Sequence, residues 1–200
     1  HARRFVQNEK NFTFSAKAHI LLAGNREGAM RMNLHSVELE QLAPEIFRVF
    51  GRQNPLLTAG DRKGLNTMTI GWCQLGRLWS LPVCTVFVRP ERYTYQFMES
   101  HDYFTVSVLP PEAKDITAFC GTKSGRDVDK VRECGLTVRY GAGDAPFFDE
   151  AEWALVCRKI YVQDMDPACV LGEREILPSY GAKGGWHRIY VGQVMEAYQK

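Results

Sequence analysis

A short polar stretch at residues 121–127 has the composition of an anion site. It reads Gly-Thr-Lys-Ser-Gly-Arg-Asp and lies between two segments with helical patterning. Backbone N–H groups at a helix start, together with Lys123, Ser124 and Arg126, are the donors that a phosphate group needs. The alternative is a solvated loop in which Asp127 caps the next helix. A Walker-type loop is excluded, because no segment has its glycine spacing.

A second candidate for anion binding is the segment Arg89-Pro90-Glu91-Arg92-Tyr93-Thr94. It follows an apolar strand and opens a helix, with Pro90 in the first turn. The junction of a strand end and a helix start favours a bound anion. A surface turn with a weak Glu91–Arg92 salt bridge explains the segment equally well.

A third candidate is the run Asn66-Thr67-Met68-Thr69, which follows a polar turn. A strand of small hydroxyl residues offers polar groups to the edge of a planar heterocycle. The simpler interpretation is a half-buried strand. His187 stands at the start of the last patterned element, and a lone histidine is more often structural than catalytic.

Metal and nucleophile chemistry have no support in the sequence. The six cysteines form no C-x-x-C pair, and the five histidines lack metal-ligand spacing. No nucleophile elbow of the G-x-S-x-G type is present. Scattered cysteines inside apolar runs are typical of small buried residues in a reducing compartment, so we expect a cytoplasmic protein without a metal site.

The elements that must position these residues are mainly strands. A helix interrupted by Pro44 is expected within residues 36–51, and a hairpin is expected at residues 56–72. Further strands are expected at residues 83–88, 104–109, 136–140, 152–163 and 187–197, and short helices at residues 90–98, 112–120 and 127–134. Six or seven strands at irregular spacing indicate a closed or partly closed β-barrel with helical decoration.

Composition limits the partners of the chain. It has 200 residues with a net charge of +2, so neither nucleic acid nor an anionic membrane is indicated. No stretch approaches the roughly 20 apolar residues of a membrane span. The basic residues 1–35, which open on His1 and lack the apolar core of a signal peptide, are interpreted as an extension with tag or processed material, and residues 36–200 as the domain.

Taken in order, the motifs resemble the FMN-binding split-barrel proteins of the flavin reductase-like family, and within it the flavoredoxin branch. The resemblance runs from about Phe47 to Glu196, and residues 1–35 fall outside it. The segments that carry it are Asn66-Thr67-Met68-Thr69 with Trp72, Leu75-Gly76-Arg77-Leu78-Trp79, the run from Phe87 to Thr94, the run from Cys120 to Lys130, and His187-Arg188-Ile189-Tyr190-Val191-Gly192.

The resemblance implies a mainly β fold with short helices, a six-stranded antiparallel split barrel. It also implies a homodimer with one FMN per subunit, in a groove near the dimer interface. The residues that it assigns to the isoalloxazine edge are Asn66, Thr67, Met68 and Thr69. Those that it assigns to the ribityl chain and the phosphate are Arg89, Arg92, Tyr93, Thr94, Lys123, Ser124 and Arg126. His187 is placed near the flavin face, where a nicotinamide or another donor docks.

The activity implied is that of an FMN-dependent oxidoreductase with NADH or NADPH as the donor. The reductase partners of two-component monooxygenases usually carry small residues and a double proline where this chain has Trp79-Ser80-Leu81-Pro82-Val83. That departure favours a flavoprotein that keeps its FMN. The alternatives are a flavoredoxin-like electron carrier reduced by a protein partner, and a non-enzymatic barrel that binds another ligand.

Overall fold

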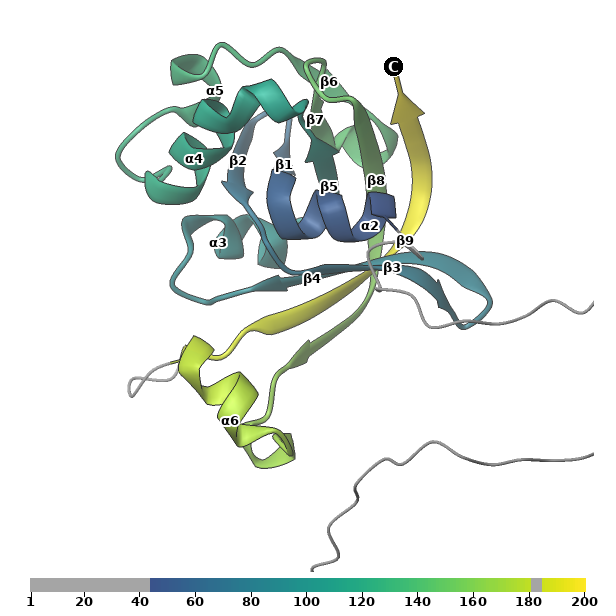
Figure 1. Cartoon of the computed structure of the whole chain (residues 1–200). Coiled ribbons are helices and arrows are strands. Elements are labelled where there is room, and N and C mark those ends of the chain that lie inside the picture. The colour runs from purple at the N-terminus through teal and green to yellow at the C-terminus, as the bar shows by residue number, and fades with distance from the viewer. Residues whose placement is uncertain (1–43, 181–184) are drawn as a thin grey trace, which may run out of the picture. The chain divides into compact units, whose positions relative to one another are not determined.

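The computed structural model describes residues 44–180 and 185–200, and a seven-stranded antiparallel sheet dominates them (Figure 1). The order of its strands is β2-β1-β5-β8-β9-β4-β3, and β6 pairs with β7 separately. The strands are β1 (Leu56–Asp61), β2 (Gly64–Thr69), β3 (Cys73–Leu78), β4 (Leu81–Val88), β5 (Tyr103–Val108), β6 (Val138–Tyr140), β7 (Pro146–Phe148), β8 (Trp153–Asp164) and β9 (Arg188–Gln199).

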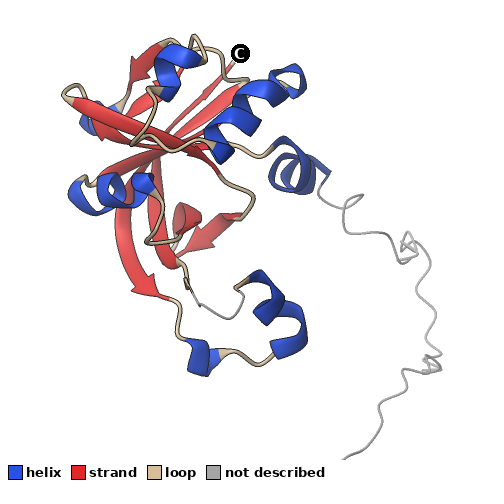
Figure 2. Ribbon diagram, turned by 90° about the vertical axis from the view of Figure 1, so that its left-hand side faces the viewer, coloured by secondary structure: helices blue, strands red, loops and turns tan. Residues whose placement is uncertain are grey.

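The helices are short and lie around the strands (Figure 2). In both ribbon views the helical segment between β8 and β9 lies at the opposite end from α4 and α5. The α-helices are α2 (Pro44–Arg48), α3 (Tyr93–Ser100), α4 (Lys114–Thr122), α5 (Lys130–Glu133) and α6 (Glu173–Ile176). A π-helical turn over Val49–Gln53 continues α2.

The paired strands β8 and β9 join the two halves of the sheet. The first half of β8 pairs with β5, whereas the first half of β9 pairs with β4. Their mutual ladder is shifted between Val156 and Cys157 and again between Lys159 and Tyr161. Such bulges bend a strand and increase its twist, so these two strands can serve both halves of a curled sheet.

Strand β1 lies between two hydrophobic cores. Leu57, on one face, belongs to a core that also takes residues from both halves of the sheet, such as Phe104 and Val86. Leu56, on the other face, packs in a second core with residues such as Phe148. Because β1 is buried on both faces, the edge strand β2 beside it is held in a fixed position.

The expected hairpin is confirmed, since β1 and β2 pair from Leu56 opposite Thr69 to Asp61 opposite Gly64. The mainly β fold with short helices is confirmed as well, although the sheet has seven strands and not six. Strand β3 was not anticipated, because its turn consists of Trp79 and Ser80, which take positive φ values of 49° and 61° without a glycine. Sequence rules expect Gly, Asn or Asp in such a turn.

Other boundaries moved by a few residues. Helix α3 begins at Tyr93 instead of residue 90. The expected helix over residues 127–134 shrinks to α5, and its N-cap is Asp129, whose side chain accepts a hydrogen bond from Arg132 N. Asp127 is therefore not the cap. Residues 36–43 of the first expected helix, and all of the extension at residues 1–35, lie outside the described residues.

Candidate functional site

The run Asn66-Thr67-Met68-Thr69 lies on β2 and is joined to the start of α3. Asn66 is 6% exposed, and its Nδ2 donates to Thr94 Oγ1 at 2.7 Å. Thr94 is 1% exposed on the first turn of α3. Two segments that the sequence indicates as separate candidate binding sites are thus connected by one buried hydrogen bond. This bond fixes the distance between the strand and the helix.

The hydroxyls of this run face the protein. Thr67 is fully buried, where its Oγ1 accepts from Thr58 Oγ1 at 2.9 Å and donates to Leu57 O. Thr69 Oγ1 donates to Thr117 O on α4 at 2.5 Å. What Thr67 and Thr69 can still offer to a ligand is mainly the strand backbone.

A cavity of about 160 Å³ brings most of the predicted site residues together. Eight of the eleven predicted cofactor-binding residues line it, and they come from β2, from the start of α3 and from the loop after α4. The eight are Asn66, Met68, Arg92, Tyr93, Thr94, Lys123, Ser124 and Arg126. The further lining residues are Glu91, Cys120, Thr122, Gly125 and Lys130.

The charges around this cavity are unbalanced. Its lining contains four cationic side chains, those of Arg92, Lys123, Arg126 and Lys130, against the single carboxylate of Glu91. The Arg126 guanidinium lies over the Tyr93 ring at 5.0 Å from the centroid, which holds this cation at the cavity wall. An excess of positive charge in a small polar cavity favours an anionic ligand.

Gly125 allows the loop after α4 to approach β2. A Cβ atom at this position would collide with the Asn66 amide oxygen and lie 2.9 Å from Tyr93 Cδ1. Only a residue without a side chain fits there. The glycine therefore brings the Lys123–Arg126 loop close to the strand.

Lys130, at the first position of α5, closes the floor of the cavity. It is 6% exposed, and its ammonium donates to Thr67 O at 2.8 Å and to Cys120 O at 2.7 Å. Burial is the main cause that lowers its pKa. A second cavity of about 600 Å³ shares five lining residues with the first, namely Asn66, Tyr93, Gly125, Arg126 and Lys130. The lysine therefore borders both cavities.

A family model described as the flavin reductase-like domain matches residues 47–200, which is more than half of the chain. The chain belongs to the flavin reductase-like family. No curated protein matches the chain. The match to the family model confirms the resemblance seen in the motifs, and the curled sheet is the split barrel of this family.

Solved structures show the same fold at low sequence identity. A flavoredoxin from Methanosarcina acetivorans is 24% identical, with a TM-score of 0.59 over 74% of this chain and 68% of that one. An FMN-binding protein from Thermus thermophilus is 20% identical, with a TM-score of 0.56 over 73% and 69%. An NADH:FAD oxidoreductase from Streptomyces globisporus is 18% identical, with a TM-score of 0.55 over 83% and 87%.

Two predicted site residues of this flavin reductase-like domain lie in an aromatic cluster and do not line the cavity. Arg89 donates to Ser179 O at 2.5 Å and lies over the Tyr180 ring. His187 shares a hydrogen bond of 3.0 Å with the Tyr180 hydroxyl, and its ring centroid is 4.6 Å from that of Trp72. Burial, and then the charge of Arg89, lower the pKa of His187 to about 4, so its imidazole is neutral near pH 7.

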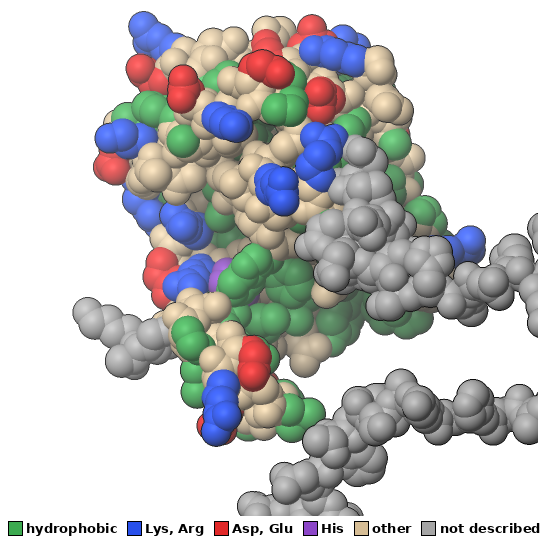
Figure 3. All heavy atoms as spheres, in the orientation of Figure 1, with side chains coloured by type: hydrophobic (Ala, Val, Ile, Leu, Met, Phe, Trp, Pro, Cys, Tyr) green, Lys and Arg blue, Asp and Glu red, His purple; other side chains and the backbone are tan. Residues whose placement is uncertain are grey.

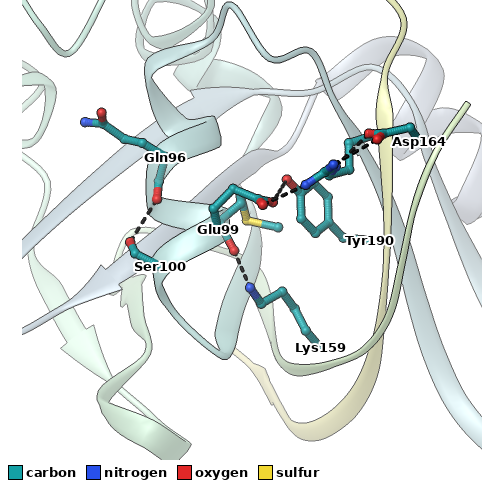
Figure 4. Close-up of polar contacts among 8 residues, drawn as sticks. Gln96, Glu99, Ser100, Lys159, Asp164 and Tyr190 are labelled. Atoms are coloured by element: carbon teal, nitrogen blue, oxygen red, sulfur yellow. Dashed lines mark hydrogen bonds and ion pairs between the residues drawn. The ribbon is translucent and has the colours of Figure 1, made fainter.

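A polar network ties the end of α3 to the start of β9 (Figure 4). Arg188, directly after His187, bonds both carboxylate oxygens of Asp164 at 2.7 and 2.8 Å. It also bonds Glu99 at 2.7 Å, and Glu99 accepts a hydrogen bond of 2.5 Å from the buried Tyr190. The network therefore fixes α3, whose first turn lines the cavity, against the strand that follows His187.

Sequence reasoning missed several of these residues. Arg188 belongs to the motif from His187 to Gly192, but Glu99 and Asp164 are far from it in the chain, and no local pattern links the three. Lys130 was visible as the last residue of the Cys120–Lys130 motif, but a lysine after a helix cap normally points into water. Its burial depends on β2 and α4 closing over it, which is a tertiary effect.

In residues 44–180 and 185–200, no group of three or more His, Cys, Asp or Glu side chains is placed to hold a metal ion. Within the same residues, no helix is long and apolar enough to cross a lipid bilayer.

Proposed function

We propose that this flavin reductase-like domain is an FMN-binding oxidoreductase that passes hydride or electrons through the bound flavin. The observation that carries the proposal is the cationic cavity between β2, α3 and the loop after α4. Its donor set fits a phosphorylated flavin, with polar strand backbone on one side and Arg, Lys and Ser on the other.

The cavity fits one end of the cofactor. Its volume of about 160 Å³ is below the ~300–1,000 Å³ typical of complete small-molecule sites. We assign Lys123, Ser124 and Arg126 to the phosphate, because they line it together on one loop. Arg92, Tyr93 and Thr94 then flank the ribityl chain, and the Asn66–Thr69 strand faces the ring edge. Arg89, which lies in the aromatic cluster, would reach the flavin from the side of His187.

Bound FMN supplies the redox chemistry, and the protein orients it and sets its surroundings. Asn66 and Thr94 hold the strand and helix at a fixed separation. The neutral His187 next to Trp72 and Tyr180 provides an aromatic surface on which the nicotinamide ring of NADH or NADPH could stack. His187 would thus position the donor without transferring a proton.

A homodimer completes the proposal. Large apolar side chains are exposed on β8 and β9 and in the turn after β3, and they include Trp79, which is 59% exposed, Tyr161, Val162 and Met195. Figure 3 shows hydrophobic side chains gathered in the lower part of one face, beside a histidine. Exposed apolar surface of this kind marks contact with another protein. The described cysteines are free thiols, which supports a reducing cytoplasm as the location.

The test is the visible absorption spectrum of the purified protein, followed by anaerobic addition of NADH or NADPH. We expect flavin bands after incubation with FMN, and their rapid bleaching by one of the two donors. Bands that persist with both donors would favour the flavoredoxin-like electron carrier, which needs a protein partner. A protein that rejects FMN would refute the proposal and leave a non-enzymatic barrel.

A further inference from the structure

Lys130 combines a buried charge with two backbone acceptors. Its ammonium bonds the carbonyl of Thr67 on β2 and the carbonyl of Cys120 on α4. An ammonium group has three N–H donors, and these two bonds use two of them. Lys130 also lines both cavities, and no hydrogen bond within the described residues uses its third donor.

No carboxylate in the described part of the chain forms an ion pair with Lys130, although Asp61, Asp127 and Asp129 line the larger cavity with it. None of the ion pairs within residues 44–180 and 185–200 includes Lys130. The groups that act on it electrostatically are the thiols of Cys120 and Cys134 and the guanidinium of Arg92. A buried cation without a paired anion is unfavourable, and an anion that enters the cavity relieves that cost.

The position of Lys130 links the two ends of the proposed cofactor site. Thr67 belongs to the strand assigned to the flavin ring, and Cys120 lies in the helix that leads into the phosphate loop. The charge of Lys130 adds to those of Lys123 and Arg126, which line the same cavity. Lys123 and Arg126 are exposed, so water weakens their attraction more than it weakens that of Lys130.

We propose that Lys130 is a specificity-determining residue that selects phosphorylated flavins over riboflavin. The inference rests on the proposed function and deepens it. Lys130 acts through its charge on the phosphate. Lys130→Met should therefore weaken FMN binding far more than riboflavin binding.

The experiment compares FMN and riboflavin by the quenching of flavin fluorescence, with the full chain at low salt. For Lys130→Met we expect the FMN dissociation constant to rise at least about tenfold, since a hydrogen bond to a charged group is lost. The riboflavin constant should change less than about threefold. Lys114→Met is the matched control, because this exposed lysine on the first turn of α4 lines neither cavity.

Two results would overturn the inference. If Lys130→Met leaves FMN affinity unchanged, the buried charge takes no part in binding. If both flavins lose affinity equally, Lys130 is only a structural link between β2 and α4. A wild-type protein that binds neither flavin would instead refute the proposed function itself, so the two failures are distinguishable.

A second measurement, on the wild type and on Lys123→Met, applies if Lys130→Met does not fold. The ratio of FMN to riboflavin affinity is followed from about pH 7 to about pH 10. Burial is the main cause that lowers the pKa of Lys130, raises the pKa of Cys120 to about 12 and raises the pKa of Cys134. As the pH rises, these shifts favour loss of the lysine charge over ionisation of the thiols. Ionisation of the flavin ring cancels in the ratio. We expect the ratio to fall, also in Lys123→Met, and a constant ratio would contradict the inference.

Discussion

Lys130 and Arg188 are two cations that each join separate elements of the barrel, but within the described residues only Arg188 forms ion pairs with carboxylates. Arg188, with a side chain 24% exposed, is held by Glu99 and Asp164. Lys130, 6% exposed, has only backbone carbonyls. The more deeply buried cation is therefore the one without a carboxylate.

This difference separates a structural charge from a binding charge. The charge of Arg188 is neutralised within the described chain, because it pairs with the carboxylates of Glu99 and Asp164, and the Tyr190 hydroxyl donates to Glu99. The Lys130 region leaves positive charge facing a cavity, together with Lys123 and Arg126. We infer that uncompensated charge marks the ligand site, and compensated charge marks the scaffold that holds it.

The largest effect is expected from Gly125→Ala, which changes the loop that lines the cationic cavity. The added Cβ would collide with the Asn66 amide and force the loop away from β2. We expect FMN binding to be lost, with a decrease of about 1–3 kcal/mol in the free energy of unfolding. Flavin titration and urea unfolding measure the two effects. Gly76→Ala is the control, because a Cβ there would meet open space; tight FMN binding by Gly125→Ala would argue against a site between loop and strand.

A smaller effect is expected from Lys123→Ala, which removes an exposed cation from the same cavity. FMN affinity should fall by about tenfold or less at low salt, and riboflavin affinity should not change. The loss should shrink as salt is added, because the side chain is exposed to water. A loss that is equal for both flavins would mean that the loop does not hold the phosphate.

The Arg188 network should respond in the opposite way, with stability changing and flavin selectivity preserved. Tyr190→Phe keeps the buried ring and removes the hydrogen bond to Glu99. We expect the free energy of unfolding to fall by about 1 kcal/mol, measured by urea denaturation. The ratio of FMN to riboflavin affinity should match that of the wild type. A changed ratio would show that the network is part of the binding site.

The smallest effect concerns His187 and acid. Its pKa of about 4 lies below the 6.5 of a free histidine, so the unfolded chain binds the extra proton more readily. The contribution of the neutral His187 imidazole to the free energy of unfolding is complete above about pH 6.5, and it is lost progressively as the pH falls toward 4. We expect the melting temperature of the wild type to drop more than that of His187→Asn over this interval. Parallel curves would contradict a buried neutral imidazole.

Local patterns predicted what depends on local physics. The alternating and fully apolar runs located β1, β2, β4, β5, β8 and β9, because periodicity reports which face is buried. The β3–β4 turn was missed because Trp79 and Ser80 adopt positive φ without glycine. The cap was misplaced because Asp127 and Asp129 are equivalent by type, and only the folded loop shows which one meets Arg132 N.

For the site, the motifs named the residues but not their surroundings. Eight of the predicted residues meet at one cavity, whereas Arg89 and His187 lie with Tyr180 in the aromatic cluster. The buried hydroxyl of Thr67 follows from its contact with Thr58 on β1, and the buried charge of Lys130 follows from packing of α5 against β2 and α4. Sequence patterns carry no signal for such long-range burial.

The most direct test of the account is an equilibrium titration of the purified chain with FMN, followed by flavin fluorescence at low and at high salt. The cationic cavity predicts saturable binding of one FMN per chain that weakens as the salt concentration rises. Binding that is absent, or that is saturable but indifferent to salt, would contradict the claim that uncompensated positive charge in this cavity holds a flavin phosphate.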